Sequence, residues 1–354
     1  MTARSLKYAS PFLIYVGALQ AFLSNGWVVF IPLVYAWVII PLLELFIPAN
    51  NKNLNEAEEE LAKQNRVYDL LLYAIVPLQF LALGAFLYSV SFVTQSTADI
   101  IGKTAVMGLL CGTFGINVGH ELGHRVNRFE QFLAKALLLS SLYMHFFIEH
   151  NKGHHKRVAT PEDPSSARYG EPVYFFWVRS IGLSYVSAWQ IANNDAVKRG
   201  FQKLSFRNEM LRFHIVQGLL LALIYFVCGS TGLLLFILAA VQGILLLETV
   251  NYIEHYGLQR QARQNGSYER TQALHSWNSN HIIGRVMLFE LSRHSDHHYL
   301  ASRKYQVLRH HESAPQLPTG YPGMMLLSLL PPLWFWVMNK RVGLFSKDQS
   351  YAQG

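Results

Sequence analysis

The sequence predicts an all-α integral membrane protein of six transmembrane helices, with a histidine-rich site and interfacial helices on one side of the bilayer. Three observations support this fold class. Half of the 354 residues are hydrophobic and only 15% are charged, whereas a soluble domain carries about 25% charged residues. Six apolar stretches come close to the roughly 20 residues that cross a bilayer. Eight of the fifteen histidines fall in three tight clusters. We treat residues 1–354 as one membrane domain.

The six expected spans are apolar runs separated by short or strongly polar breaks. They cover residues 8–24, 27–47, 69–92, 98–118, 211–228 and 233–252. The three shortest connections contain no Lys or Arg, whereas the loops on the opposite side contain most of the basic residues. The positive-inside rule assigns those loops to the cytoplasm, and six spans place both termini there as well. The histidine-bearing segments 120–210 and 253–354 follow on this side.

The charge balance restricts the partners. A formal charge of +8 suits an anionic lipid surface or an acidic protein. We expect no nucleic acid partner, because the basic residues are spread through membrane-flanking loops without a recognisable nucleic-acid module. The two cysteines, Cys111 and Cys228, cannot build an iron–sulfur centre, which needs four thiolates. Any electrons that the protein uses must therefore come from another chain.

The three histidine clusters have the spacing of metal ligands. In the first, His-Glu-Leu-Gly-His, the i, i+4 spacing places both imidazoles on one helical face. The others read Glu-His-Asn-Lys-Gly-His-His and Arg-His-Ser-Asp-His-His. Imidazole suits iron, zinc, copper or nickel, and eight ligands exceed the roughly four to six that one ion takes. The sequence therefore predicts two metal ions. The eight residues are His120, His124, His150, His154, His155, His294, His297 and His298.

A shared metal site restricts the topology. If the apolar segment 131–148 crossed the bilayer, the first two clusters would lie about 30 Å apart. We therefore expect this segment to be re-entrant or interfacial. A second ambiguous segment, 324–338, contains Pro331-Pro332, and we expect it to be broken and to lie at the interface.

The end of the sixth span adds a ninth histidine. His255 in Asn-Tyr-Ile-Glu-His-Tyr-Gly lies at the same membrane level as the clusters. A carboxylate inside a span, such as that of Glu248, is costly and usually functional. Metal-bound imidazoles commonly donate their second N–H to a carboxylate, so we expect nearby acids to orient the ligands, Glu254 and Asp296 above all. The supporting candidates are Glu248, Asn251, Glu254, Asp296, His275 and His281.

These motifs resemble the histidine boxes of the membrane fatty acid desaturase and hydroxylase superfamily. The stretches around His255, His150 and His294, together with His-Ser-Trp-Asn-Ser-Asn-His at 275–281, are similar to those of bacterial alkane 1-monooxygenases. The resemblance runs from the second span to about Pro322. It implies one fatty-acid-desaturase-like domain in the bacterial inner membrane, with a non-haem centre of two Fe ions. The ligands carried over are His120, His124, His150, His154, His155, His255, His294, His297 and His298.

The resemblance also implies a reaction. Medium- or long-chain n-alkanes would be hydroxylated by O₂ to 1-alkanols, with electrons passing from NAD(P)H through a reductase and rubredoxin. Rubredoxin would be a separate chain, since this one lacks the cysteines for a fused domain. No catalytic side chain beyond the metal centre is expected. The cavity for the alkane would lie among the spans, and Trp27, Trp37 and Phe80 are possible linings.

Four other functions share part of this sequence pattern. Within the oxygenases, a methyl hydroxylase of alkyl aromatics such as xylene and a fatty-acyl desaturase share the histidine pattern. The first cluster also matches the H-E-x-x-H motif of zinc proteases, with Glu121 as the base. That alternative leaves the other clustered histidines unexplained. A metal transporter would place its ligands near the middle of the bilayer, not at one face.

Overall fold

The computed structural model describes the backbone of residues 3–352, which is helical apart from loops, turns and two isolated β-bridges. Within this part of the chain, five helical segments are long and apolar enough to cross a membrane. They are Arg4–Leu23, Gly26–Phe46, Val67–Phe92, Thr97–Gly123 and Glu209–His255. The first four correspond to the first four spans expected from the sequence.

Several of these segments are composite. The first contains α1 (Ala3–Leu6), η1 (Lys7–Ala9) and α2 (Phe12–Leu23). The second contains η2 (Gly26–Phe30), α3 (Ile31–Val34), the π-helix η3 (Tyr35–Ile39) and α4 (Ile40–Phe46). After α5 (Glu56–Gln64), α6 (Val67–Phe92) forms the third alone. The fourth joins α7 (Thr97–Leu110), the π-helix η4 (Cys111–Ile116) and α8 (Asn117–Gly123). The fourth helix therefore runs past residue 118, where the expected span ended, and carries His120 in its last turn.

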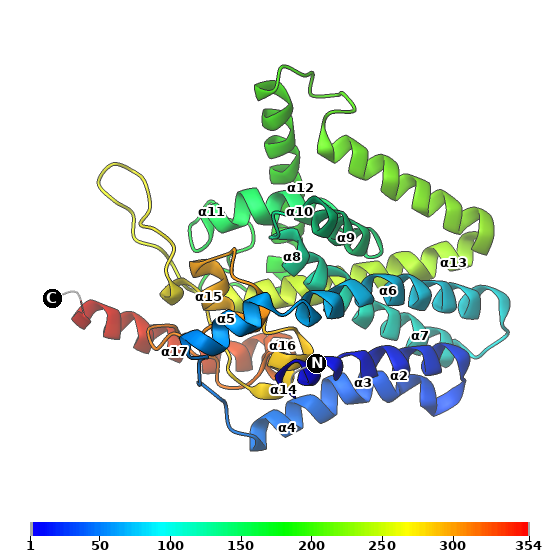
Figure 1. The fold of residues 1–354 in the computed structure, drawn as a ribbon, viewed down its shortest axis with the longest axis horizontal. Helices are drawn as coiled ribbons and strands as arrows, with labels where there is room; N and C mark the ends of the chain where they lie inside the picture. The colour runs from blue at the N-terminus through cyan, green and yellow to red at the C-terminus, as the bar shows by residue number, and fades with distance from the viewer. Residues whose placement is uncertain (1–2, 353–354) are drawn as a thin grey trace.

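The last two expected spans form one element, α13 (Glu209–His255), of 47 residues. A straight helix of that length would measure about 70 Å, more than twice the hydrocarbon thickness of about 30 Å. The helix is broken at Gly229, whose φ of 69° is in the left-handed region that glycine adopts without strain. Its two arms meet in a sharp bend at the right of Figure 1. The short connection expected between the spans 211–228 and 233–252 is thus reduced to one non-helical residue.

Neither of the two ambiguous apolar segments forms one continuous helix. Residues 131–148 contribute to α9 (Arg128–Leu139), a turn with Leu142 at φ 54°, and α10 (Phe146–Glu149). The 12 residues of α9 reach about 18 Å, too short to cross a bilayer. Segment 324–338 is broken as expected, between α16 (Tyr321–Ser328) and α17 (Pro331–Ala352). The prolines stand in the first turn of α17, where a missing N–H is tolerated.

The bundle places the histidine-bearing elements at one end. In Figure 1, α2, α6, α7 and the second arm of α13 run side by side, with their short connections at the right. Helix α12 (Val173–Lys198) runs across their direction. The elements at the opposite end are η5 (His150–His154), α11 (His155–Arg157), η6 (Ala273–His275), α14 (Ile282–Met287), α15 (His294–Tyr299) and η7 (Tyr305–Val307).

Close packing of small residues brings α13 against η4. A Cβ atom added at Gly243 would lie 2.5 Å from Cβ of Cys111 and 2.9 Å from the backbone N of Gly112. Helices in a bilayer associate largely through such close approaches, because lipid removes the hydrophobic driving force between them. The contact fixes the arm of α13 that ends at His255.

We expect Gly243→Leu to lower the thermal unfolding temperature of the purified protein in detergent, because overpacking costs about 1–3 kcal/mol. The matched control is Gly218→Leu in the other arm of α13, where an added Cβ meets nothing within 4 Å. That variant should unfold at the wild-type temperature or slightly above it. Equal unfolding temperatures for the two variants would contradict the packing argument.

Candidate metal centre

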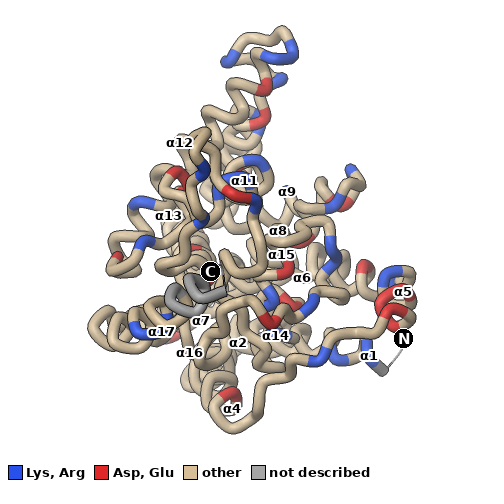
Figure 2. The backbone as a smooth tube through the Cα atoms, turned by 90° about the vertical axis from the view of Figure 1, so that its left-hand side faces the viewer, with Lys and Arg blue, Asp and Glu red and all other residues tan. Residues whose placement is uncertain are grey.

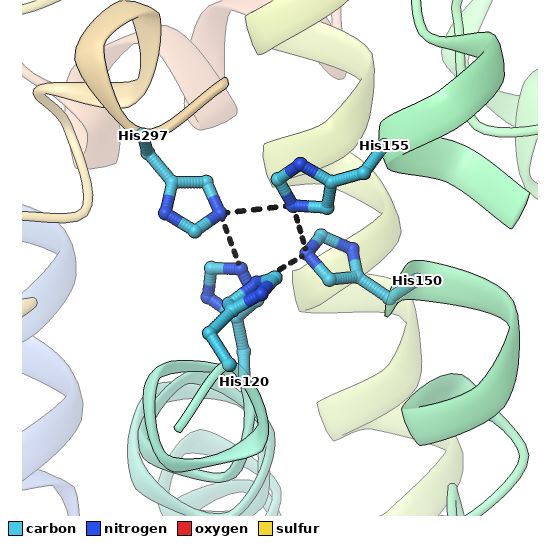
Figure 3. A group of neighbouring side chains, drawn as sticks. His120, His150, His155 and His297 are labelled. Atoms are coloured by element: carbon cyan, nitrogen blue, oxygen red, sulfur yellow. Dashed lines mark hydrogen bonds between the residues drawn. The ribbon is translucent and has the colours of Figure 1, made fainter. Parts of the chain in front are cut away.

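Nine buried or half-buried histidines form two groups, and they are the nine expected from the sequence. Within each group, one nitrogen of every imidazole lies within 4.8 Å of the others. Figure 3 shows part of the larger group, with rings from three regions of the chain pointing toward one another. The larger group contains His120, His124, His150, His155 and His297, and the smaller contains His154, His255, His294 and His298.

The local helix geometry explains how neighbouring histidines are sorted. His120 and His124 lie four residues apart at the end of α8 and join the same group. In the second cluster, η5 is a π-helix, whose i→i+5 bonding is rare and often marks functional sites. The five-residue spacing brings Nε2 of His155 to 3.0 Å from Nε2 of His150, while His154 faces the other group. A regular α-helix would have paired His150 with His154.

The third cluster serves both groups. His294 and His298, four residues apart in α15, face the smaller group, whereas His297 faces the larger one. His255, the last residue of α13, lies with Nε2 3.3 Å from Nε2 of His294. One short helix thus links the two groups, and the end of a long apolar helix completes the smaller one.

The contacts between the rings favour a cation in each group. In the larger group, Nε2 of His155 lies 3.0 Å and 3.1 Å from Nε2 of His150 and His297. A ring nitrogen carries either one hydrogen or one lone pair, so it cannot pair well with two others. Metal–nitrogen bonds of about 2.1 Å hold ligands up to about 4.2 Å apart. Spacings within 4.8 Å need only a small contraction to fit.

Burial keeps the imidazoles in the form that binds metals. Loss of water lowers the pKa of His150, His155, His297 and His298 well below the usual value, and neighbouring histidines lower it further. These four rings are therefore neutral near pH 7, whereas the neighbouring carboxylate of Asp163 outweighs burial at His154 and raises the pKa of that ring. Neutral imidazole has the free lone pair that a metal ion requires.

Two supporting residues were missed by the sequence analysis. The carboxylate of Asp163, which is fully buried, lies 2.8 Å from Nδ1 of His154 and also accepts a hydrogen bond from Ser166. The hydroxyl of Ser276 lies 3.3 Å from Nδ1 of His255. Both contacts are made on the nitrogen opposite the group, the position from which a partner orients a metal ligand. Asp163 lies in a loop with no spacing relation to the clusters, so no sequence signal identified it.

The expected orienting acids behave differently. Oε2 of Glu254 lies 3.2 Å from Nε2 of His294, the nitrogen that faces His255. It therefore lies among the converging nitrogens and not behind a ligand. Asp296 instead bonds to Arg303 and His311. Its expected contact with a clustered histidine is not found.

The remaining candidates contact other partners. Glu248 accepts hydrogen bonds from Tyr143 at 2.8 Å and Ser180 at 2.6 Å, and Asn251 is a further partner of its carboxylate. This buried network fastens the turn before α10 to α12 and α13. His275 contacts Glu269, and His281 contacts Ser279. The backbone of His275 is also a hydrogen-bond partner of His255, and a supporting role for these two residues stays a prediction.

Comparison with known proteins defines the family. The Fatty acid desaturase model matches residues 101–328. Alkane 1-monooxygenase 2 of Pseudomonas aeruginosa is 40% identical over 88% of this chain and 84% of its own length. Alkane 1-monooxygenase of Acinetobacter baylyi is 40% identical over 86% of this chain and 74% of its own. The chain belongs to the alkane 1-monooxygenases of the fatty acid desaturase family. A xylene/toluene monooxygenase hydroxylase component of Pseudomonas putida is more distant, at 26% identity over 80% of this chain and 76% of its own length.

In this member of the family, Glu121 of the H-E-x-x-H match is not free to act as a base. Its Oε1 atom accepts hydrogen bonds from Arg125 at 2.7 Å and from the backbone N–H of Tyr305 at 3.1 Å. The carboxylate is thus held by a local ion pair with Arg125 and by a backbone hydrogen bond that ties α8 to η7, after α15. The motif reflects the metal-ligand spacing of the desaturase family and not a zinc protease.

We expect Asp163→Asn to weaken metal binding by the smaller histidine group about 10- to 100-fold, the usual effect of losing a carboxylate behind a ligand. Metal content per chain during chelator titration measures the change. Asp99→Asn is the control, because Asp99 bonds to Gly26 and Ser96 at the other end of the bundle. Equal metal affinity in the two variants would show that Asp163 has no such role.

Proposed function

We propose that this protein is an integral inner-membrane enzyme that hydroxylates the terminal methyl group of medium- or long-chain n-alkanes with O₂. The observation that carries the proposal is the pair of converging histidine groups beside an apolar cavity, in a chain 40% identical to alkane 1-monooxygenases. Sequence similarity favours alkanes over alkyl aromatics, since the xylene/toluene relative is only 26% identical.

The nine histidines would hold two Fe ions, five around one and four around the other. A set of five imidazoles exceeds the tetrahedral set usual for zinc, which favours iron. Bound iron would supply the activation of O₂. The protein's own residues hold the ligands in place: Asp163 and Ser276 contact the far nitrogens of His154 and His255, and burial excludes bulk water.

An apolar cavity among the spans would accept the alkane. Its walls come from α2, η3, α4, α7, η4, α8, α13, α14 and α16, and include Trp37, Val250 and Met325. Asn117, Leu288 and Leu291 line both this cavity and a smaller one that reaches His120 and His297. The shared lining supports a path from the membrane interior to the larger histidine group.

This arrangement would present one end of a chain-like substrate to the centre. The walls offer few polar groups, so a hydrocarbon is bound by shape and by the exclusion of water. Of the aromatic residues named as possible linings, Trp37 lines this cavity. Trp27 lines a different hollow, and Phe80 packs against the hydrophobic core.

We propose that the chain crosses the membrane six times and that each of the two arms of α13 crosses it once. The positive-inside rule then assigns the histidine end and both termini to the cytoplasm, where NAD(P)H is available. Figure 2, viewed from that end, shows Lys and Arg side by side with Asp and Glu around the bundle. Rubredoxin and its reductase would deliver electrons there, because Cys111 and Cys228 cannot build an iron–sulfur centre by themselves.

The direct test is a product assay. Membranes containing the protein, supplied with rubredoxin, its reductase and NADH, should convert n-octane or n-hexadecane to the corresponding 1-alkanol. Gas chromatography with mass spectrometry identifies the product, and ¹⁸O₂ should label its hydroxyl oxygen. An alkene as sole product would indicate a desaturase. Turnover of xylene to a benzylic alcohol without turnover of alkanes would indicate an alkyl-aromatic hydroxylase.

We expect His255→Ala to lose iron and alkane turnover together, because the smaller group would keep only three imidazoles. Iron per chain and 1-alkanol formation are measured on the same preparation. His214→Ala is the control, since His214 bonds to Tyr185 and the backbone of Met210 outside both groups. Full iron content with lost activity in His255→Ala would exclude His255 as a ligand.

A further inference from the structure

Three arginines gather around a small hollow at the outer end of α12. The hollow is lined by Arg199 from the end of α12, Arg207 from the following loop and Arg212 from the first turn of α13. Lys152 of η5 lines its other side. In Figure 2, Lys and Arg mark the tip of the arm that α12 forms at the top of the view.

The acidic residues at the hollow do not neutralise these arginines. Asp195 forms an ion pair with Lys152, and Glu209 forms one with Lys135 at 2.6 Å. Among the described residues, none of the three guanidinium groups has a hydrogen bond or an ion pair; Arg207 only lies over the ring of Phe201. Three unpaired guanidinium groups at one hollow form a site for an anion, and their planar donor sets match phosphate oxygens.

Large apolar side chains surround the arginines on the same loop. Phe201, Leu204 and Phe206 are 40%, 79% and 75% exposed. A water-facing loop would not expose three such residues within six positions. Helix α12 runs across the direction of the spans (Figure 1) and exposes further apolar residues, Phe175 and Val178 among them. This is the position of a helix lying along a membrane surface.

We propose that the tip of α12 binds the phosphate headgroup of an anionic phospholipid. Arg199, Arg207 and Arg212 contact the phosphate, and Phe201, Leu204 and Phe206 insert among the acyl chains. A free phosphate would leave the apolar side chains without a partner. An acidic protein would meet a surface that is as apolar as it is basic. The lipid alone satisfies both parts of the loop.

The test uses the full-length protein, delipidated in detergent and titrated with dioctanoyl phosphatidylglycerol, with native mass spectrometry counting bound lipids. Each arginine near a membrane surface contributes about a fivefold factor in affinity. We therefore expect R207Q/R212Q to bind this lipid about 30-fold more weakly, and added salt to weaken wild-type binding. R263Q/R270Q is the matched control, because Arg263 and Arg270 are equally exposed on the 258–275 loop.

The outcomes are distinct. Weaker binding in R207Q/R212Q alone, with unchanged iron content and unfolding temperature, supports the proposal. Equal losses in both double variants, or equal binding of dioctanoyl phosphatidylcholine, would overturn it. Displacement of the lipid by inorganic phosphate at equal concentration would assign the site to a free anion. Loss of donor-supported turnover with unchanged lipid binding would assign the arginines to a protein partner.

Discussion

The rest of the structure depends on one constraint: imidazole nitrogens from four segments of the chain must meet at one membrane level. The four segments are α8, η5 with α11, the C-terminal end of α13, and α15. They are spread over the sequence from residue 120 to residue 298. Each long helix must therefore deliver its histidine at the same end of the bundle. This requirement explains why α9 stops after 12 residues and why α13 reverses at Gly229. A straight α13 would carry His255 far from the other rings.

Buried ion pairs fix the elements that carry these rings. Glu121 pairs with Arg125 and Glu149 with Arg157, both within a few residues of a clustered histidine. Glu290 pairs with Lys7 and Arg285 and accepts a hydrogen bond from Tyr8. It stands at φ 62° beside Phe289 at φ 51°, a backbone region that costs a non-glycine residue about 1–2 kcal/mol. The ion pairs of Glu290 with Lys7 and Arg285 stabilise this turn, which leads directly into α15. Removing one partner of such a pair would leave an uncompensated buried charge.

Features with a local sequence signal could be predicted. Apolar runs located the first four crossing segments, and the i, i+4 spacing of His120 and His124 placed both rings in one group. The sequence did not divide the second cluster between the two groups, because that division depends on the π-helix η5, which pairs His150 with His155 and turns His154 to the other group. Asp163 and Ser276 reach the ligands from loops, and tertiary contacts of that kind have no periodicity to read. The contacts of Asp296 could not be predicted either, because they are tertiary contacts. Asp296 neighbours three clustered histidines in sequence, but its carboxylate bonds to Arg303 and His311.

The bundle separates an apolar cavity from the polar region that holds the histidine groups, and this separation has a functional consequence. The apolar cavity is enclosed by the spans, whereas the histidine groups lie where charged loops cover the helix ends. Asn117, Leu288 and Leu291 stand at the boundary, since they line both the apolar cavity and the hollow that reaches His120 and His297. The side chain of Asn117 donates to the backbone oxygen of Leu288 at 3.0 Å, which joins two of these three residues at the boundary. A hydrocarbon could thus reach the larger histidine group from the membrane side, while electrons could reach it from the opposite side without crossing the path of the substrate.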